Sequence, residues 1–296
     1  EKTLEAVKRK NISMVTYDDM KIEAQKNNLT SYSELILGLP SDTYKTFTDG
    51  LVKCFDKQYS HVVLVYLARS LQGTEMASSE SIKKYGIITR TMKVGFGLYE
   101  KIEGGVDEIE DIIVGNKDMP IEDWRKAHTF SAISLTIYNY RLGFYILNFL
   151  KDKYLIDYKE FFEYLISSSR NNSSTKLFNK CLETISEIEE SSLNSISSLK
   201  SFSYTGDIVY DFHEVPLIVF LNKIGDFYIE FRKIVDSFLK LKKINIDHAV
   251  LDEVFLYQKS LIPNWFYPLK EKINFKNNIP QYFYALLDDE NSIKIE

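Results

Sequence analysis

The segment that most constrains this fold is a short apolar strand that runs directly into a glycine and a proline. Residues 33–43 read S-E-L-I-L-G-L-P-S-D-T. Gly38 has no side chain, so another backbone or a ligand can come close to the end of the strand. Pro40 cannot continue ladder pairing, and Asp42 or Thr43 can cap a following helix. The pattern therefore predicts a strand-to-helix junction of an α/β layer, open to a ligand above the carboxyl end of the strand.

A second apolar segment extends this layer. Residues 61–67 read H-V-V-L-V-Y-L, a β-branched and apolar run that is typical of a parallel strand covered on both faces. Helical patterns lie over residues 18–27 and 43–57, so helix and strand alternate as in a parallel α/β sheet or barrel. Two strands can neither close a barrel nor form an independent parallel sheet. We therefore expect this part of the chain to complete a larger structure.

The rest of the chain is predicted to be mostly helical. The spacing of apolar residues indicates one long helix from residue 118 to about 149, then helices over 158–168, 175–199, 216–239 and 247–261. An extended segment over 86–101 and a strand over 108–114 precede them. These patterns divide the chain into residues 1–85, a connecting segment 86–117 and a helical domain 118–296.

Composition excludes several classes of partner. The net charge of −5 and the pI near 5.6 argue against binding to nucleic acid or to an anionic membrane, because both need clustered Lys and Arg. Cys54 and Cys181 lie too far apart in sequence for a disulfide framework or a metal knuckle, which favours a reducing compartment. No segment reads as a membrane span or a signal peptide. We expect a cytoplasmic protein with no nucleic-acid and no membrane partner.

The four histidines carry no recognisable chemistry in the sequence. They are isolated, and none has a second ligand at metal-binding spacing: His61, His128, His213 and His248. Structural or surface roles suit lone histidines. Neither a Ser-His-Asp or Cys-His arrangement nor a phosphate loop can be argued from the residues. We therefore assign no catalytic residue and no metal ligand.

Three segments resemble, in the same order, the pattern of radical S-adenosylmethionine (SAM) enzymes. They are L-E-A-V-K-R-K-N over 4–11, similar to the helix after the fourth barrel strand; residues 33–43, similar to the fifth strand with its G-L-P turn; and residues 66–75, similar to the sixth strand and its L-x-G-T turn. Ser41 and Asp42 depart from the Gly-Glu pair usual in the family. Residues 111–124, D-I-I-V-G-N-K-D-M-P-I-E-D-W, resemble a segment that follows the barrel in cobalamin-binding radical SAM proteins.

This resemblance implies an α/β fold, in which the C-terminal remnant of a radical SAM partial TIM barrel precedes a mostly α-helical C-terminal domain. It implies SAM as a cofactor, with Arg9 near its carboxylate and Glu34 as a second contact. Gly38 would let the backbone approach SAM, and main-chain groups near Leu67 would contact the adenine. A guanidinium suits a carboxylate because it donates two parallel hydrogen bonds. Without the resemblance, Arg9 reads as a surface arginine, Glu34 as a solvent-exposed acid and Leu67 as a core residue.

Two further cofactors are implied, a [4Fe-4S] cluster held by C-x3-C-x2-C and cobalamin marked by D-x-H-x-x-G. Neither motif occurs in these 296 residues. Because residues 2–9 read as a helix already in progress, we expect both motifs in a missing N-terminal half, which would be a partner along with a small-molecule substrate. The chain would then be a fragment of a cobalamin-dependent radical SAM enzyme, for radical methyl transfer or rearrangement, and inactive alone. The alternative is a non-catalytic helical binding or scaffold protein.

Overall fold

A computed structural model describes residues 2–10, 13–27, 29–55, 61–93, 108–262, 272–287 and 295. The elements in chain order are α1 (Lys2–Ala6), α2 (Met14–Lys26), β1 (Ser31–Leu37), α3 (Tyr44–Phe55), β2 (His61–Leu67), the 3₁₀ turn η1 (Glu75–Ala77), α4 (Ser79–Tyr85), β3 (Ile88–Lys93), β4 (Ile109–Gly115), α5 (Ile121–Ser134), the π-helical turn η2 (Leu135–Asn139), α6 (Phe144–Tyr154), α7 (Tyr158–Ser169), α8 (Lys176–Leu193), β5 (Leu199–Ser201), β6 (Val209–Asp211), α9 (Val215–Leu221), α10 (Ile224–Leu241), α11 (His248–Ser260) and α12 (Ile279–Leu287). The protein is α/β and mostly helical, as predicted; the partial barrel itself stays a prediction, as does the division into domains.

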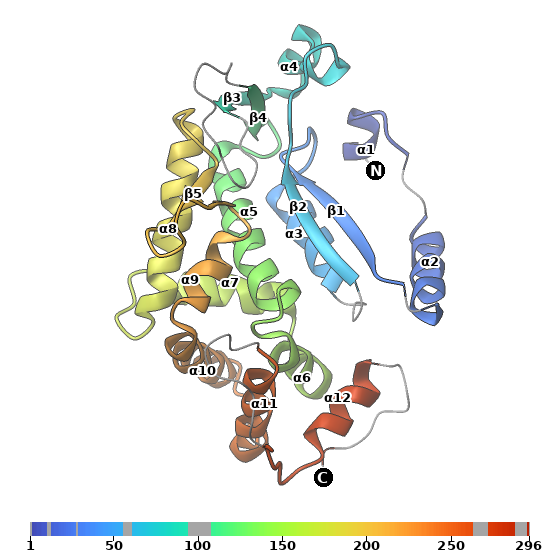
Figure 1. Cartoon of the computed structure of the whole chain (residues 1–296). Coiled ribbons are helices and arrows are strands. Elements are labelled where there is room, and N and C mark those ends of the chain that lie inside the picture. Colours follow the sequence, from blue (N-terminus) through green and yellow to red (C-terminus); the bar gives the residue numbers. More distant parts are fainter. Residues whose placement is uncertain are drawn as a thin grey trace.

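The two predicted strands of the opening layer form a parallel pair. β1 and β2 run side by side with Leu35 opposite Val65, and α3 lies beside them (Figure 1). Beyond β2 the chain changes partner, because the Ser70 N–H donates to the Asp111 carbonyl at 2.7 Å. That carbonyl belongs to β4, which pairs antiparallel with β3. In the described part of the chain, no strand pairs with the second edge of β1.

Only one face of the β1–β2 pair is covered. Val63 and Val65 are buried on the side where α3 and α5 lie, whereas Tyr32 and Tyr66 on the opposite face are 66% and 41% exposed. The prediction that residues 61–67 are covered on both faces is therefore wrong for the described residues. The sequence of β2 carries apolar residues on both sides, and the described elements cover one of them.

The long helix predicted from residue 118 to 149 is divided in two. α5 runs into the π-helical turn η2, and the chain turns before α6 begins. Arg141 has a φ of 65° in this turn, and a Cβ on Gly143 would lie 2.7 Å from the Ile137 Cγ2 and 2.8 Å from the Phe231 Cε1. The turn therefore leaves no room for a side chain at residue 143, where it packs against Ile137 and against Phe231 of α10.

Other expectations differ in detail. The helix predicted over 216–239 is α9 followed by α10, with a break at residues 222–223. The β5–β6 hairpin and α12 were not predicted from the sequence. The strand pair predicted around residues 86–114 is β3 and β4, and residues 94–107 lie outside the described part. No described helix is long and apolar enough to cross a membrane.

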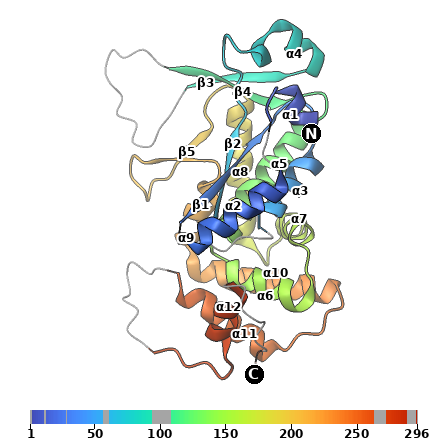
Figure 2. The same cartoon turned by 90° about the vertical axis from the view of Figure 1, so that its right-hand side faces the viewer.

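α5 is the helix around which the fold is built. It contacts α3, α7, α8, α9, β1 and β4, and in Figure 2 it lies at the height of the strands, above α6 and α10. Its Trp124, Phe130 and Ile133 side chains are fully buried. One hydrophobic core therefore includes residues of the β1–β2 layer and of the helices that follow it.

A buried carboxylate joins α5 to α8. Glu189 is 2% exposed and accepts a hydrogen bond from the Thr129 hydroxyl at 2.8 Å. The same carboxylate lies 3.2 Å from the His128 Nδ1 and 3.3 Å from the Arg125 Nε. The His128 ring stacks on Phe212, with 4.3 Å between ring centroids. His128 therefore has a structural role, because it links α5, α8 and the segment before α9.

Replacing Glu189 with leucine should lower the free energy of unfolding by roughly 2–4 kcal/mol, because buried donors on α5 would lose their acceptor. Urea denaturation followed by circular dichroism measures the loss. Glu187→Leu is the matched control on the same helix, since Glu187 is 51% exposed and should change stability by less than about 1 kcal/mol. Equal losses in the two variants would contradict the role given to Glu189.

Candidate functional site

A cavity of about 580 Å³ lies over the open face of β1 and β2, near their carboxyl ends. We call it the strand-end pocket. Its lining consists of residues 6–9, 66–69 and 74–76, with Glu34, Ile36, Leu39 and Leu71. The end of α1 forms one wall and η1 another, as the position of α1 beside the strands suggests in Figure 1. This volume is within the range of pockets that hold small-molecule ligands.

The structure brings three of the four predicted site residues into this pocket. Arg9, Glu34 and Leu67 all line it, whereas Gly38 does not. The Arg9 and Glu34 side chains are exposed, and neither has an ion-pair or hydrogen-bond partner among the described residues. Their contact with SAM stays a prediction, which nothing in the structure tests.

The remaining charges of the strand-end pocket are paired. The Lys8 Nζ lies 2.6 Å from the Glu75 Oε2, which ties the end of α1 to η1, and this hydrogen bond raises the pKa of Lys8. The Arg69 Nε lies 2.8 Å from the Glu110 Oε2. Burial raises the pKa of Glu110, although the charge of Arg69 acts against it. Among the described residues, Arg9 and Glu34 are the charged side chains of this pocket that have no ion-pair partner.

The predicted contact between adenine and main-chain groups near Leu67 stays a prediction, and the residue after Leu67 is already paired. The Ala68 N–H donates to the Leu37 carbonyl at 2.8 Å, and the Ala68 carbonyl accepts from the Ile113 N–H at 2.8 Å. Ala68 therefore presents no unsatisfied main-chain group to a ligand. The apolar lining of the pocket near this point comes from Ile36, Leu39 and Leu67.

Gly38 is required by the protein's own packing. Its φ is +100°, and a Cβ there would lie 3.0 Å from the Ile113 carbonyl oxygen and 3.6 Å from the Trp124 Cδ1. The groups that approach the end of β1 at this residue thus belong to β4 and α5. The predicted approach of a cofactor to Gly38 is not tested, but the packing alone explains a glycine there.

Asn116 is a positioning residue that the sequence did not single out. It is 2% exposed, and its Nδ2 donates to the Leu39 carbonyl at 3.1 Å and to the Gly38 carbonyl at 3.3 Å. Its Oδ1 accepts from the backbone N–H groups of Asp118 and Met119 at 2.9 and 3.0 Å. Asn116 therefore fastens the G-L-P turn, including the pocket residue Leu39, to the turn before α5. An Asn after a strand reads only as a turn residue in sequence.

The turn after Pro40 contains Ser41 and Asp42 in place of the Gly-Glu pair. Ser41 has a φ of 65°, in the region that favours the glycine usual there. Thr43 caps α3, because its Oγ1 accepts from the Thr46 N–H at 3.1 Å. Asp42 accepts from the Thr43 N–H at 3.0 Å, and burial raises the pKa of Asp42. The departure from Gly-Glu thus leaves both the turn and the helix start in place.

The described residues do not fit a metal cluster. Cys54 is on α3 and Cys181 on α8, and burial raises the pKa of Cys181 well above its usual range, which disfavours the thiolate that binds metals. No group of three or more His, Cys, Asp or Glu residues within the described ranges could hold a metal ion. Neither an iron–sulfur cluster nor cobalamin has ligands that can be identified here.

No family model matches the chain, but two curated relatives are similar to it over about half of its length. The cobalamin-dependent radical SAM methyltransferase TokK of Streptomyces tokunonensis is 28% identical over 163 residues, which cover 54% of this chain and 23% of TokK. The 2-(S-pantetheinyl)-carbapenam-3-carboxylate methyltransferase of Streptantibioticus cattleyicolor is 27% identical over 165 residues, which cover 55% of this chain and 24% of the relative. The match thus spans about a quarter of each relative.

Replacing Gly38 with alanine should lower the free energy of unfolding by about 1–3 kcal/mol, because alanine at positive φ is strained and its Cβ would press on the Ile113 carbonyl. Thermal and urea denaturation measure the change. Gly50→Ala is the control within α3, where a Cβ would meet nothing closer than 3.8 Å; it should stabilise the protein by up to about 1 kcal/mol. A Gly38→Ala variant as stable as Gly50→Ala would refute this account.

Replacing Asn116 with aspartate should remove both donors to the G-L-P turn and lower stability by roughly 2–4 kcal/mol, because a carboxylate oxygen would face two carbonyls. Amide hydrogen exchange read by mass spectrometry should become faster over residues 38–43. Asn194→Asp is the control, since Asn194 is exposed and donates to a single carbonyl in α8. Unchanged exchange at the turn would argue against the positioning role.

Proposed function

We propose that this chain is the C-terminal part of a cobalamin-dependent radical SAM enzyme and supplies part of the SAM site and the substrate-side helices. The similarity to TokK, a cobalamin-dependent radical SAM methyltransferase, supports this proposal. The reaction would be a radical methyl transfer or rearrangement on a small-molecule substrate. Both relatives have methyl transfer in their names, which favours methyl transfer for this chain.

The observation that carries the proposal is the pair of unmatched charges in the strand-end pocket. SAM ends in an amino acid, with one carboxylate and one ammonium group. Arg9 would bind the carboxylate through two parallel hydrogen bonds, and Glu34 would accept hydrogen bonds from the ammonium group. Ile36, Leu39 and Leu67 would contact the adenosyl portion and exclude water from it. When bound, SAM would supply the radical or the methyl group of the reaction.

The free edge and the open face of the β1–β2 pair also support the proposal that this chain is part of a larger sheet. β1 has a second edge without a strand partner in the described part of the chain, and the face that carries Tyr32 and Tyr66 is open. Parallel strands are normally covered on both faces and paired within a sheet. We propose that further strands of the same enzyme pair with this edge. Residues outside this chain would then hold the cluster and cobalamin; within the described ranges, no group of three or more His, Cys, Asp or Glu residues could hold a metal ion.

A non-catalytic role remains the second candidate, because the same open edge could add to the sheet of another protein. In that case the helices after residue 118 would form a binding or scaffold domain and the strand-end pocket would bind no nucleotide. SAM binding separates the two candidates.

Titration calorimetry with SAM tests the proposal. Arg9→Gln and Glu34→Gln should each weaken SAM binding by about tenfold or more, because each removes a charge-assisted contact to the amino-acid end. Adenosine, which lacks that end, should bind wild type and both variants equally.

Arg170→Gln and Glu187→Gln are the matched controls, since neither residue lines the strand-end pocket, and SAM affinity should not change in them. If the folded wild-type chain binds no SAM, the assignment of the strand-end pocket as part of a SAM site is wrong and the scaffold role is favoured.

A further inference from the structure

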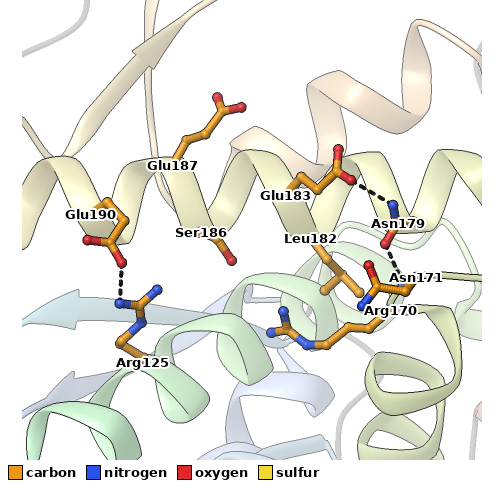
Figure 3. Close-up of a pocket in the computed structure, with 9 residues that line it drawn as sticks. All are labelled: Arg125, Arg170, Asn171, Asn179, Leu182, Glu183, Ser186, Glu187 and Glu190. Carbon is orange, nitrogen blue, oxygen red and sulfur yellow. Dashed lines mark hydrogen bonds and ion pairs between the residues drawn. The ribbon is translucent and has the colours of Figure 1, made fainter.

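A second cavity, of about 610 Å³, lies between α5 and α8 and shares no lining residue with the strand-end pocket. We call it the α5–α8 pocket. Arg125 of α5, Arg170 and Asn171 after α7, and one face of α8 line it (Figure 3). The lining carries two arginines and three glutamates, so the ion pairs among these charges determine which ligand the cavity can bind.

Arg170 has no ion-pair or hydrogen-bond partner for its guanidinium among the described residues. The turn that carries Arg170 is nevertheless fixed by a hydrogen bond to α8. Asn171 has a φ of 54°, and its N–H donates to the Asn179 Oδ1 of α8 at 2.8 Å. In Figure 3 the Arg170 side chain runs beneath α8 toward Arg125. A fixed backbone thus presents an unmatched guanidinium to the cavity.

Ser186 supplies a second free donor. Its hydroxyl has no hydrogen-bond partner among the described residues, whereas the nearby Thr184 hydroxyl donates to the Lys180 carbonyl at 2.9 Å, as is common within helices. Figure 3 shows the Ser186 hydroxyl pointing from α8 toward the space between the Arg125 and Arg170 guanidiniums. Three donors from three segments therefore surround one volume.

The carboxylates around the cavity are already matched. Glu187 lies 2.8 Å from the Lys200 Nζ. Glu183 lies 3.8 Å from the Lys180 Nζ and accepts a hydrogen bond from the Asn179 Nδ2 at 2.8 Å. Both point to the opposite side of α8 in Figure 3. Glu190 lies 2.5 Å from the Arg125 NH1 and is 57% exposed, so it can turn to water when a ligand binds Arg125. The unmatched charge of the cavity is the positive charge of Arg170.

We propose that the α5–α8 pocket binds the phosphoryl group of a small molecule through Arg170, Arg125 and Ser186. Guanidinium groups recognise phosphate oxygens by paired hydrogen bonds. Donors that approach from α5, from α8 and from the turn after α7 suit a tetrahedral oxyanion better than a planar carboxylate. The proposal is independent of SAM binding, because the two pockets have no residue in common.

Titration with inorganic phosphate at low ionic strength, followed by two-dimensional NMR, tests this site. Wild type should show saturable shifts at the amides around Asn171 and Ser186. Arg170→Gln should weaken binding by about tenfold or more and Ser186→Ala by about threefold or more, because each loses a hydrogen bond to a charged group. Lys176→Gln removes one charge from α8 outside the cavity and should bind like wild type.

Glycerol phosphate and acetate complete the experiment. Tighter binding of glycerol phosphate than of inorganic phosphate would support a phosphate ester as the ligand, and equal binding would support free phosphate. Acetate that binds as tightly as phosphate would overturn the phosphoryl assignment. So would an absence of saturable binding, or equal losses in Arg170→Gln and Lys176→Gln. Unchanged circular dichroism and SAM affinity in Arg170→Gln would show that neither misfolding nor the strand-end pocket accounts for the result.

Discussion

The buried carboxylate of Glu189 holds α5 against α8, and the placement of both pockets depends on this contact. A charge that is 2% exposed is costly unless donors surround it. Thr129, His128 and Arg125 supply such donors along about one turn of α5. Because Arg125 also reaches Glu190 at the rim of the α5–α8 pocket, the same interaction that orders the core sets one wall of that cavity.

Packing against α5 also constrains the strand layer. Gly38 has a φ of +100°, and a Cβ there would lie 3.0 Å from the Ile113 carbonyl oxygen, so a glycine is needed where the end of β1 meets β4 and the buried Trp124 of α5. Asn116 then fastens Gly38 and Leu39 to the turn before α5 through four hydrogen bonds. The helical part of the chain thus positions the G-L-P turn, and with it one side of the strand-end pocket.

Periodicity in the sequence was sufficient for most elements and for the strand-to-helix junction, because capping and apolar spacing are local properties. Periodicity failed to predict features that depend on packing between elements far apart in the sequence. The break before α6 places Gly143 against Phe231 of α10, a contact that no local pattern shows. Asn116 was missed because its importance comes from carbonyls 77 and 78 residues earlier in the chain. The open face of β2 was not predicted, because the apolar sequence of a strand does not show which elements pack on each of its faces.

By itself the sequence determined the two parallel strands, the mostly helical remainder and a resemblance that selected Arg9, Glu34, Gly38 and Leu67. Only the tertiary structure decided that Arg9, Glu34 and Leu67 share one pocket while Gly38 packs against β4 and α5. It also placed Arg170 at a cavity between α5 and α8, where its guanidinium has no partner among the described residues. Local propensity acts within a few residues, whereas burial and charge pairing depend on elements that meet only in the folded chain.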